Sequence, residues 1–170
     1  YFQMLMDENL LDLDSRKNKA PGAYNLFYGV SRRPFIFINN SGTHEDVSTL
    51  LHEGGHAFHA FEALVVPYFL ERSENYIPVE FLEVASVAME LLASPYITKE
   101  HGGFYTEREA ARARLEHLEG LITFWPYMAL VDAFQHWVYE NPQDGANALK
   151  CEQHWAELWE RYMAGIDYTG

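Results

Sequence analysis

The stretch LLHEGGHAFHAF, residues 50–61, decides the fold of this chain, because its pattern predicts a helix with two histidines on one face. It places His52 and His56 four residues apart, with Glu53 directly after the first histidine. In an α-helix, this spacing stacks two imidazoles one turn apart on the same face, where one metal ion can bind both. The sequence therefore predicts two metal ligands on one helix.

The residues on either side of this motif also favour a helix. Thr43 and Asp46 have the spacing of a capping box, and apolar residues follow at helical intervals. We predict a helix over about residues 43–64. Gly54 and Gly55 are unfavourable in a helix interior, which indicates that a packed strand or a substrate approaches the helix closely there.

A catalytic zinc ion usually has three protein ligands and an open position for water, so a third ligand is needed. A second helix is predicted from about Pro78 to Ser94, with Glu80, Glu83 and Glu90 on one face. We choose Glu83, because it lies in an apolar run where an unpaired carboxylate would be costly to bury. The other two glutamates are candidates to orient the histidine ligands through their free ring nitrogens.

Glu53 follows the first histidine and points to the same side of the helix. We predict that it is the general base, which takes a proton from a metal-activated water without binding the metal. His59 lies one turn beyond His56, and three roles stay open for it: a fourth ligand, a hydrogen-bond donor to a ligand, or a histidine of the core. The remaining histidines have no partner at ligand spacing and are predicted to be structural: His44, His101, His117, His136 and His154.

The rest of the chain has the signals of two strands and further helices. Tyr1–Leu11 has the apolar spacing of an amphipathic helix, and two strands are predicted at about residues 24–28 and 34–40. A long helix is predicted up to Glu140, with a kink at Pro126. A last helix is predicted over about residues 143–163.

Composition bounds the class of protein. Hydrophobic residues make up 48% of the chain and aromatic residues 15%, which is sufficient for a packed core. Twelve basic and 25 acidic residues leave a net charge of −13, which disfavours nucleic acid and anionic membranes as partners. A single cysteine, Cys151, cannot form an internal disulfide, and no signal peptide or membrane span is recognisable, so we expect a cytoplasmic location.

Taken together, these motifs resemble the oligoendopeptidase F branch of the thimet oligopeptidase family of zinc peptidases. The resemblance covers most of the chain and follows the family's order. It rests on SRKNKAPGAY (15–24), PFIFIN (34–39), LLHEGGHAFHAF (50–61), FLEVASVAMELL (81–92) and EHLEGLITFWPYMALVDAFQHWVY (116–139).

The resemblance implies a mainly α fold: a zincin-like catalytic core with a small β-strand pair beside the active-site helix, followed by long helices. It implies one zinc ion held by His52, His56 and Glu83, with Glu53 as the catalytic base, in agreement with the assignment from the residues. It also implies that a sheet edge, assigned to PFIFINN (34–40), pairs with extended peptides. Short, unstructured oligopeptides are the expected substrates.

Members of this family are several times longer, and a downstream helical stretch carries a histidine and tyrosines that stabilise the tetrahedral intermediate. We therefore expect residues 1–170 to form a single catalytic-core domain that is a fragment of a larger helical peptidase. Two alternatives to a zinc endopeptidase stay open. The first is a non-catalytic zinc-binding fragment, which self-associates or docks to missing segments of the same enzyme. The second is a metal-dependent exopeptidase.

Overall fold

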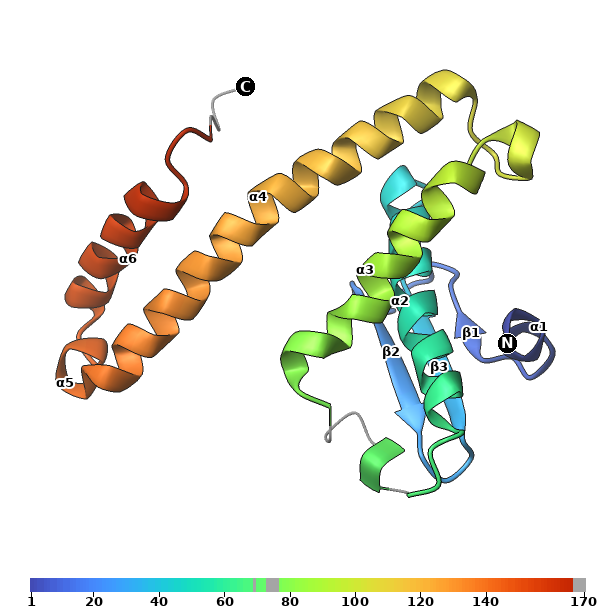
Figure 1. Cartoon of the computed structure of the whole chain (residues 1–170), viewed down its shortest axis with the longest axis horizontal. Helices are drawn as coiled ribbons and strands as arrows, with labels where there is room; N and C mark the ends of the chain where they lie inside the picture. The colour runs from blue at the N-terminus through green and yellow to red at the C-terminus, as the bar shows by residue number, and fades with distance from the viewer. Residues whose placement is uncertain (69, 73–76, 167–170) are drawn as a thin grey trace. The chain divides into compact units, whose positions relative to one another are not determined.

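The computed structural model describes residues 1–68, 70–72 and 77–166 (Figure 1). The chain divides into two compact units, Tyr1–Glu107 and Arg108–Gly170. The fold is mainly helical with one small sheet, as the sequence predicted. The assignment of residues 1–170 to a single catalytic-core domain stays a prediction.

The first unit contains a three-stranded sheet in the order β1-β3-β2. The strands β2 (Ala23–Tyr28) and β3 (Arg33–Ile38) are the predicted pair, and they run antiparallel. A third strand, β1 (Leu11–Asp12), lies parallel to β3 and was not predicted. We assigned its residues to the first helix, but α1 covers only Phe2–Asp7, and the left-handed conformation of Asn9 (φ 54°) turns the chain away from helical geometry.

The prediction that PFIFINN forms the sheet edge is wrong, because β3 lies between the two other strands. The Ile36 amide donates to the Leu10 carbonyl on the β1 side, so Asn25, which lies opposite Ile36, turns its own amide and carbonyl away from β3. By the same alternation, the backbone groups of Ala23 and Phe27 also point outward. The strand β2 is therefore an edge of the sheet, and the backbone groups of these three residues lie along it.

Helix α2 (His44–Ala63) lies against this sheet and is the predicted motif helix. The predicted capping box is present, and the Asp46 carboxylate accepts the Thr43 amide at 2.8 Å. The core between helix and sheet contains Leu5, Ile36, Ile38, Ala57 and Phe61. The opposite face of α2 stays available for the next helix.

Helix α3 (Val79–Ala93) is the predicted carboxylate helix, and it packs on α2 (Figure 1). The two backbones meet at Gly55, where an added Cβ would lie 2.5 Å from the Ala85 carbonyl oxygen and 2.6 Å from Ser86 Cα. The close approach inferred at Gly55 is therefore confirmed, but a helix makes it and not the strand or the substrate that we considered. At Gly54, an added Cβ would have no neighbour within 4 Å.

Short 3₁₀ segments and a glycine turn complete the first unit. They are η1 (Leu70–Arg72), η3 (Ser94–Tyr96) and η4 (Lys99–His101). A bridge between Thr98 and Tyr105 closes the turn, and the Tyr105 hydroxyl lies 2.7 Å from Nδ1 of His44 at the start of α2. His101 pairs with the Thr98 hydroxyl at 2.9 Å, so both histidines have a hydrogen-bond partner, and the structural role of His44 and His101 stays a prediction.

The second unit consists of α4 (Glu107–Glu140), α5 (Pro142–Gly145) and α6 (Ala148–Tyr162). Helix α4 contains Pro126 and is a single helix (Figure 1), and the kink predicted at this residue stays a prediction. The last predicted helix is divided in two, because the Asn147 side chain accepts the amides of Leu149 and Lys150 and starts α6. None of the helices in the described ranges is long and apolar enough to cross a membrane.

The two adjacent glycines of α2 give a matched test of the helix contact. Gly55→Ala should lower the free energy of unfolding by about 1–3 kcal/mol, because the new methyl group overlaps the α3 backbone. Gly54→Ala should raise it by about 0.5–1 kcal/mol, because alanine is the better helix former and no atom obstructs it. Urea denaturation of both variants measures the pair, and equal effects would contradict the assigned contact.

Candidate metal centre

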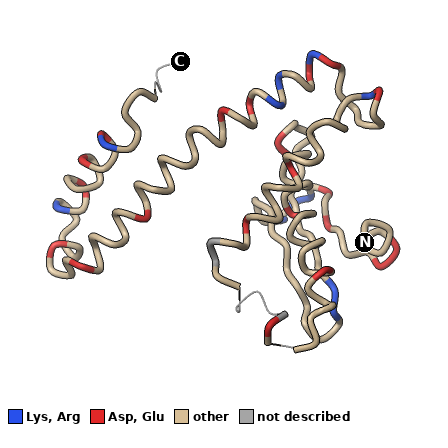
Figure 2. Tube along the Cα trace, in the orientation of Figure 1, with Lys and Arg blue, Asp and Glu red and all other residues tan. Residues whose placement is uncertain are grey.

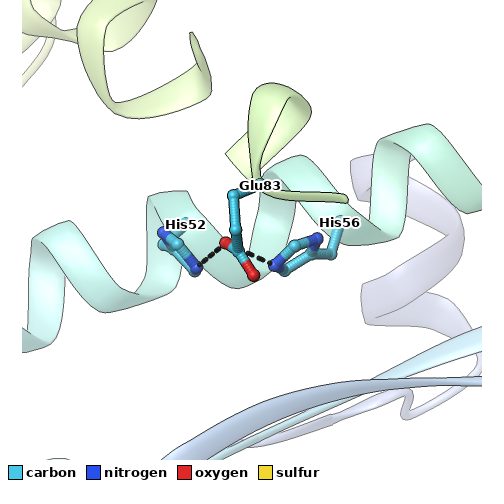
Figure 3. A group of neighbouring side chains, drawn as sticks. All are labelled: His52, His56 and Glu83. Atoms are coloured by element: carbon cyan, nitrogen blue, oxygen red, sulfur yellow. Dashed lines mark ion pairs between the residues drawn. The ribbon is translucent and has the colours of Figure 1, made fainter. Parts of the chain in front are cut away.

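Three predicted ligands meet between α2 and α3 (Figure 3). One oxygen of Glu83, Oε2, lies 3.0 Å from Nε2 of His52 and 3.4 Å from Nε2 of His56. One ligand atom of each of the three side chains lies within 4.8 Å of the others. The structure thus brings together two side chains that lie one turn apart on α2 and one side chain of α3, as the sequence predicted.

The reason we gave for choosing Glu83 is wrong, although its position is as expected. Its side chain is 61% exposed, so an apolar burial cost does not single it out. Its place is set instead by the packing of α3 on α2 and by Ser86, whose Oγ donates to Glu83 Oε2 at 2.8 Å. Sequence reasoning missed Ser86, because a serine in a helix has no distinguishing signal until its neighbours are known.

Glu90 makes the contact that we considered for it. Its Oε1 lies 2.7 Å from Nδ1 of His52, on the ring nitrogen that faces away from Glu83. This hydrogen bond orients the ring and is the main cause of the raised pKa of His52. Burial lowers the pKa of His56, which keeps that imidazole neutral at a pH where it can be a ligand. The side chain of Glu80 lies outside the described part of the structure.

Glu53 lies deeper than the ligands and is 7% exposed. Burial raises the pKa of its carboxyl group, and the nearby Glu83 carboxylate adds to this effect. Opposing influences are the His52 imidazole and a hydrogen bond from the Asn25 backbone amide on β2. Sequence reasoning did not find Asn25, since its amide is aimed by the strand register. The arrangement suits a proton acceptor with a pKa closer to neutrality.

A cavity of about 320 Å³ lies beside these side chains. One wall is α2, with His52, Glu53 and His56, and the opposite wall is the open strand β2. The lining also includes His59, Ala60, Ala63, Ile77 and Leu82. Within the described residues, His59 is outside the ligand group, and its place in the cavity wall favours a role other than that of a core histidine.

The residues present fit a divalent cation. Two imidazole nitrogens and one carboxylate are the usual ligand set of a catalytic zinc site with an open position. Helices α2 and α3 carry seven acidic residues and no lysine or arginine. Figure 2 shows the acidic residues of the chain in red. The surrounding charge therefore favours a cation where the three ligand atoms converge.

This combination of fold and site is that of a metallopeptidase. The model of peptidase family M3 matches residues 2–169, and the chain therefore belongs to this family. The oligoendopeptidase F homolog of Mycoplasma genitalium is 37% identical over 93 residues, which cover 53% of this chain and 14% of that relative. The chromosomal oligoendopeptidase F of Lactococcus lactis subsp. cremoris is 29% identical over 98 residues, covering 55% of this chain and 15% of that relative.

Solved structures agree with the sequence relatives. PZ peptidase A, solved with an inhibitor, superposes with a TM-score of 0.78 at 32% identity, over 100% of this chain and 28% of the other. A Bacillus anthracis structure provisionally named oligoendopeptidase F gives a TM-score of 0.79 at 32% identity, over 95% and 28%. The resemblance inferred from the motifs is confirmed, and the chain spans less than a third of the solved relatives' length.

The raised pKa of Glu53 predicts how the metal-free chain responds to pH. A carboxyl group whose pKa is raised in the folded state keeps its proton to higher pH there, so the stability that it contributes is lost as pH rises. The free energy of unfolding should therefore fall, relative to that of Glu53→Gln, as pH rises from the ordinary glutamate value of 4.5 through the raised pKa of the folded state. Urea denaturation of both proteins in chelator tests this, and parallel pH profiles would contradict it.

Proposed function

We propose that this chain carries the catalytic centre of a zinc endopeptidase that hydrolyses short, unstructured oligopeptides. The observation that carries the proposal is the convergence of His52, His56 and Glu83 within 4.8 Å, beside the buried carboxyl group of Glu53. One zinc ion per chain is expected. A location in the cytoplasm is part of the proposal and rests on the composition of the chain alone.

When bound, zinc would supply a Lewis acid that polarises the scissile carbonyl and lowers the pKa of water at the open position. His52, His56 and Glu83 would hold the ion, and Glu90 would keep the His52 ring oriented through its 2.7 Å contact. Glu53 would take a proton from the attacking water and deliver it to the leaving nitrogen. Its raised pKa suits both transfers, because the proton must be accepted and then released.

The open edge of β2 supports an extended peptide as the substrate. Ala23, Asn25 and Phe27 line the cavity, and their backbone groups point away from β3. A peptide that adds as a strand would pair with the free groups of this edge and pass the ligand cluster. A folded protein cannot present such a strand, so unstructured oligopeptides fit this site best.

A second candidate function is a zinc-binding piece that requires other parts of a longer enzyme. The chain covers 28% of the solved relatives, and α3 presents Phe81 and Val84, which are 63% and 59% exposed. Exposed apolar side chains of this kind favour self-association or docking to further segments. An exopeptidase is distinguished by its failure to cleave a peptide with blocked ends.

The proposed function is tested by metal content and turnover together. Zinc measured by elemental analysis should be one per chain, and Glu83→Ala should lose it, because two histidines alone leave the ligand set incomplete. Glu53→Gln should keep the zinc and lower hydrolysis of an internally quenched peptide at least about 10²-fold, because no group then takes the proton. Unchanged turnover in Glu53→Gln, or a parent chain without zinc, would refute the proposal.

The role of the β2 edge in peptide binding is tested by removing one backbone amide that points away from β3. Ala23→Pro replaces an amide that points away from β3 with a ring nitrogen, which an edge strand tolerates. We expect KM for the quenched peptide to rise about fivefold to tenfold, the effect of one hydrogen bond, with little change in kcat. Leu26→Pro is the control, since its amide faces β3, and it should unfold the sheet. An unchanged KM in folded Ala23→Pro would exclude pairing at this residue.

A further inference from the structure

Ser86 lies on α3 one turn after Glu83, at the point where α3 contacts α2. The residue is 0% exposed, and its Cα would lie only 2.6 Å from a Cβ added to Gly55. A buried hydroxyl at such a contact needs a hydrogen-bond partner, and neighbouring side chains leave it little room to choose one. Its partner is the third ligand of the metal centre.

The hydroxyl group of Ser86 contacts the same oxygen that faces both histidines. Ser86 Oγ donates to Glu83 Oε2 at 2.8 Å, and that oxygen lies 3.0 Å from His52 Nε2 and 3.4 Å from His56 Nε2. The hydroxyl also lies 3.0 Å from the Glu83 backbone carbonyl. With one proton to donate, the carboxylate is the stronger acceptor, because a hydrogen bond to an ionised group is about twice as strong as one between neutral groups.

Glu83 requires such an anchor, since the packing of α3 on α2 places its backbone but leaves its side chain exposed. Its side chain is 61% exposed, whereas those of His52 and His56 are 30% and 20% exposed. A long, exposed carboxylate samples several rotamers, and only some of them bring an oxygen to the histidines. The buried Ser86 hydroxyl favours the rotamers of Glu83 in which Oε2 accepts its hydrogen bond.

We propose that Ser86 is a positioning residue that holds Glu83 Oε2 over the two histidines and thereby raises the affinity of the centre for zinc. The inference rests on the proposed function, because it concerns the same metal. Ser86 would orient Glu83, as Glu90 orients His52. Two of the three proposed ligands would then each be oriented by a side chain of α3. The third, His56, has the least exposed side chain of the three, at 20%.

The test compares two hydroxyl groups that bond backward to a helix carbonyl. Thr123 Oγ1 lies 3.0 Å from the carbonyls of Glu119 and Gly120, so it has the backbone contact of Ser86 without a carboxylate. Ser86→Ala should raise the Kd for zinc about tenfold or more, as removal of a hydrogen-bond partner of a metal ligand typically does. Thr123→Ala should leave this Kd unchanged. Zinc affinity is measured by competition with a chromophoric chelator on the full chain.

Stability and a double-mutant cycle separate positioning from packing. The metal-free Ser86→Ala chain should unfold at the temperature of the parent, and only the upward shift on adding zinc should shrink. In a Glu83→Ala background, Ser86→Ala should change the residual zinc Kd by less than about twofold, because its partner is absent. A lower melting temperature without metal, or an equal loss of affinity in that background, would overturn the inference.

The failure of this inference is distinguishable from failure of the proposed function. A parent chain that binds no zinc refutes the proposed function and the inference with it. A parent that binds zinc, and whose Ser86→Ala variant binds it equally well, refutes the role of Ser86 alone. A Ser86→Ala variant with weaker zinc binding and unchanged metal-free stability supports the inference whether or not the isolated chain cleaves peptides.

Discussion

The close packing of α3 on α2 at Gly55 is the constraint on which the site depends. The two histidines are local to α2, but a third ligand reaches them only if a second helix comes within backbone contact. Glycine allows this approach, because any Cβ at that position would overlap Ala85 and Ser86. Glycine is unfavourable in a helix, but at this position it allows the short distance between α2 and α3 that brings the three side chains of the candidate centre together.

Three carboxyl groups lie close together at the candidate site, although the packing of the helices does not require them there. Glu53 is buried with a raised pKa, and Glu83 and Glu90 contact the same histidine from two sides. Three carboxyl groups around two imidazoles are a poor arrangement for an empty protein and a good one for a divalent cation. The candidate centre is therefore suited to a divalent cation, and clusters of titratable groups of this kind are common at functional sites.

The sheet contributes an edge rather than a large core. The strand β3 is central, and β2 is the edge strand beside the cavity, which its alternate residues Ala23, Asn25 and Phe27 line. The Asn25 amide already bonds to Glu53, so the strand that would receive a peptide also orients the proposed base. Asn25 therefore connects the proposed peptide-binding edge with the proposed base.

By itself, the sequence determined the helices around residues 43–64 and 78–94, the pairing of His52 with His56, and the family, because helical periodicity and short motifs are local properties. The tertiary structure alone decided which strand is the edge beside the cavity, since a two-residue strand such as β1 leaves almost no signal. It also decided that Glu83 is exposed and held by Ser86. Those features depend on segments distant in the chain, and their contacts exist only after the helices and strands have packed.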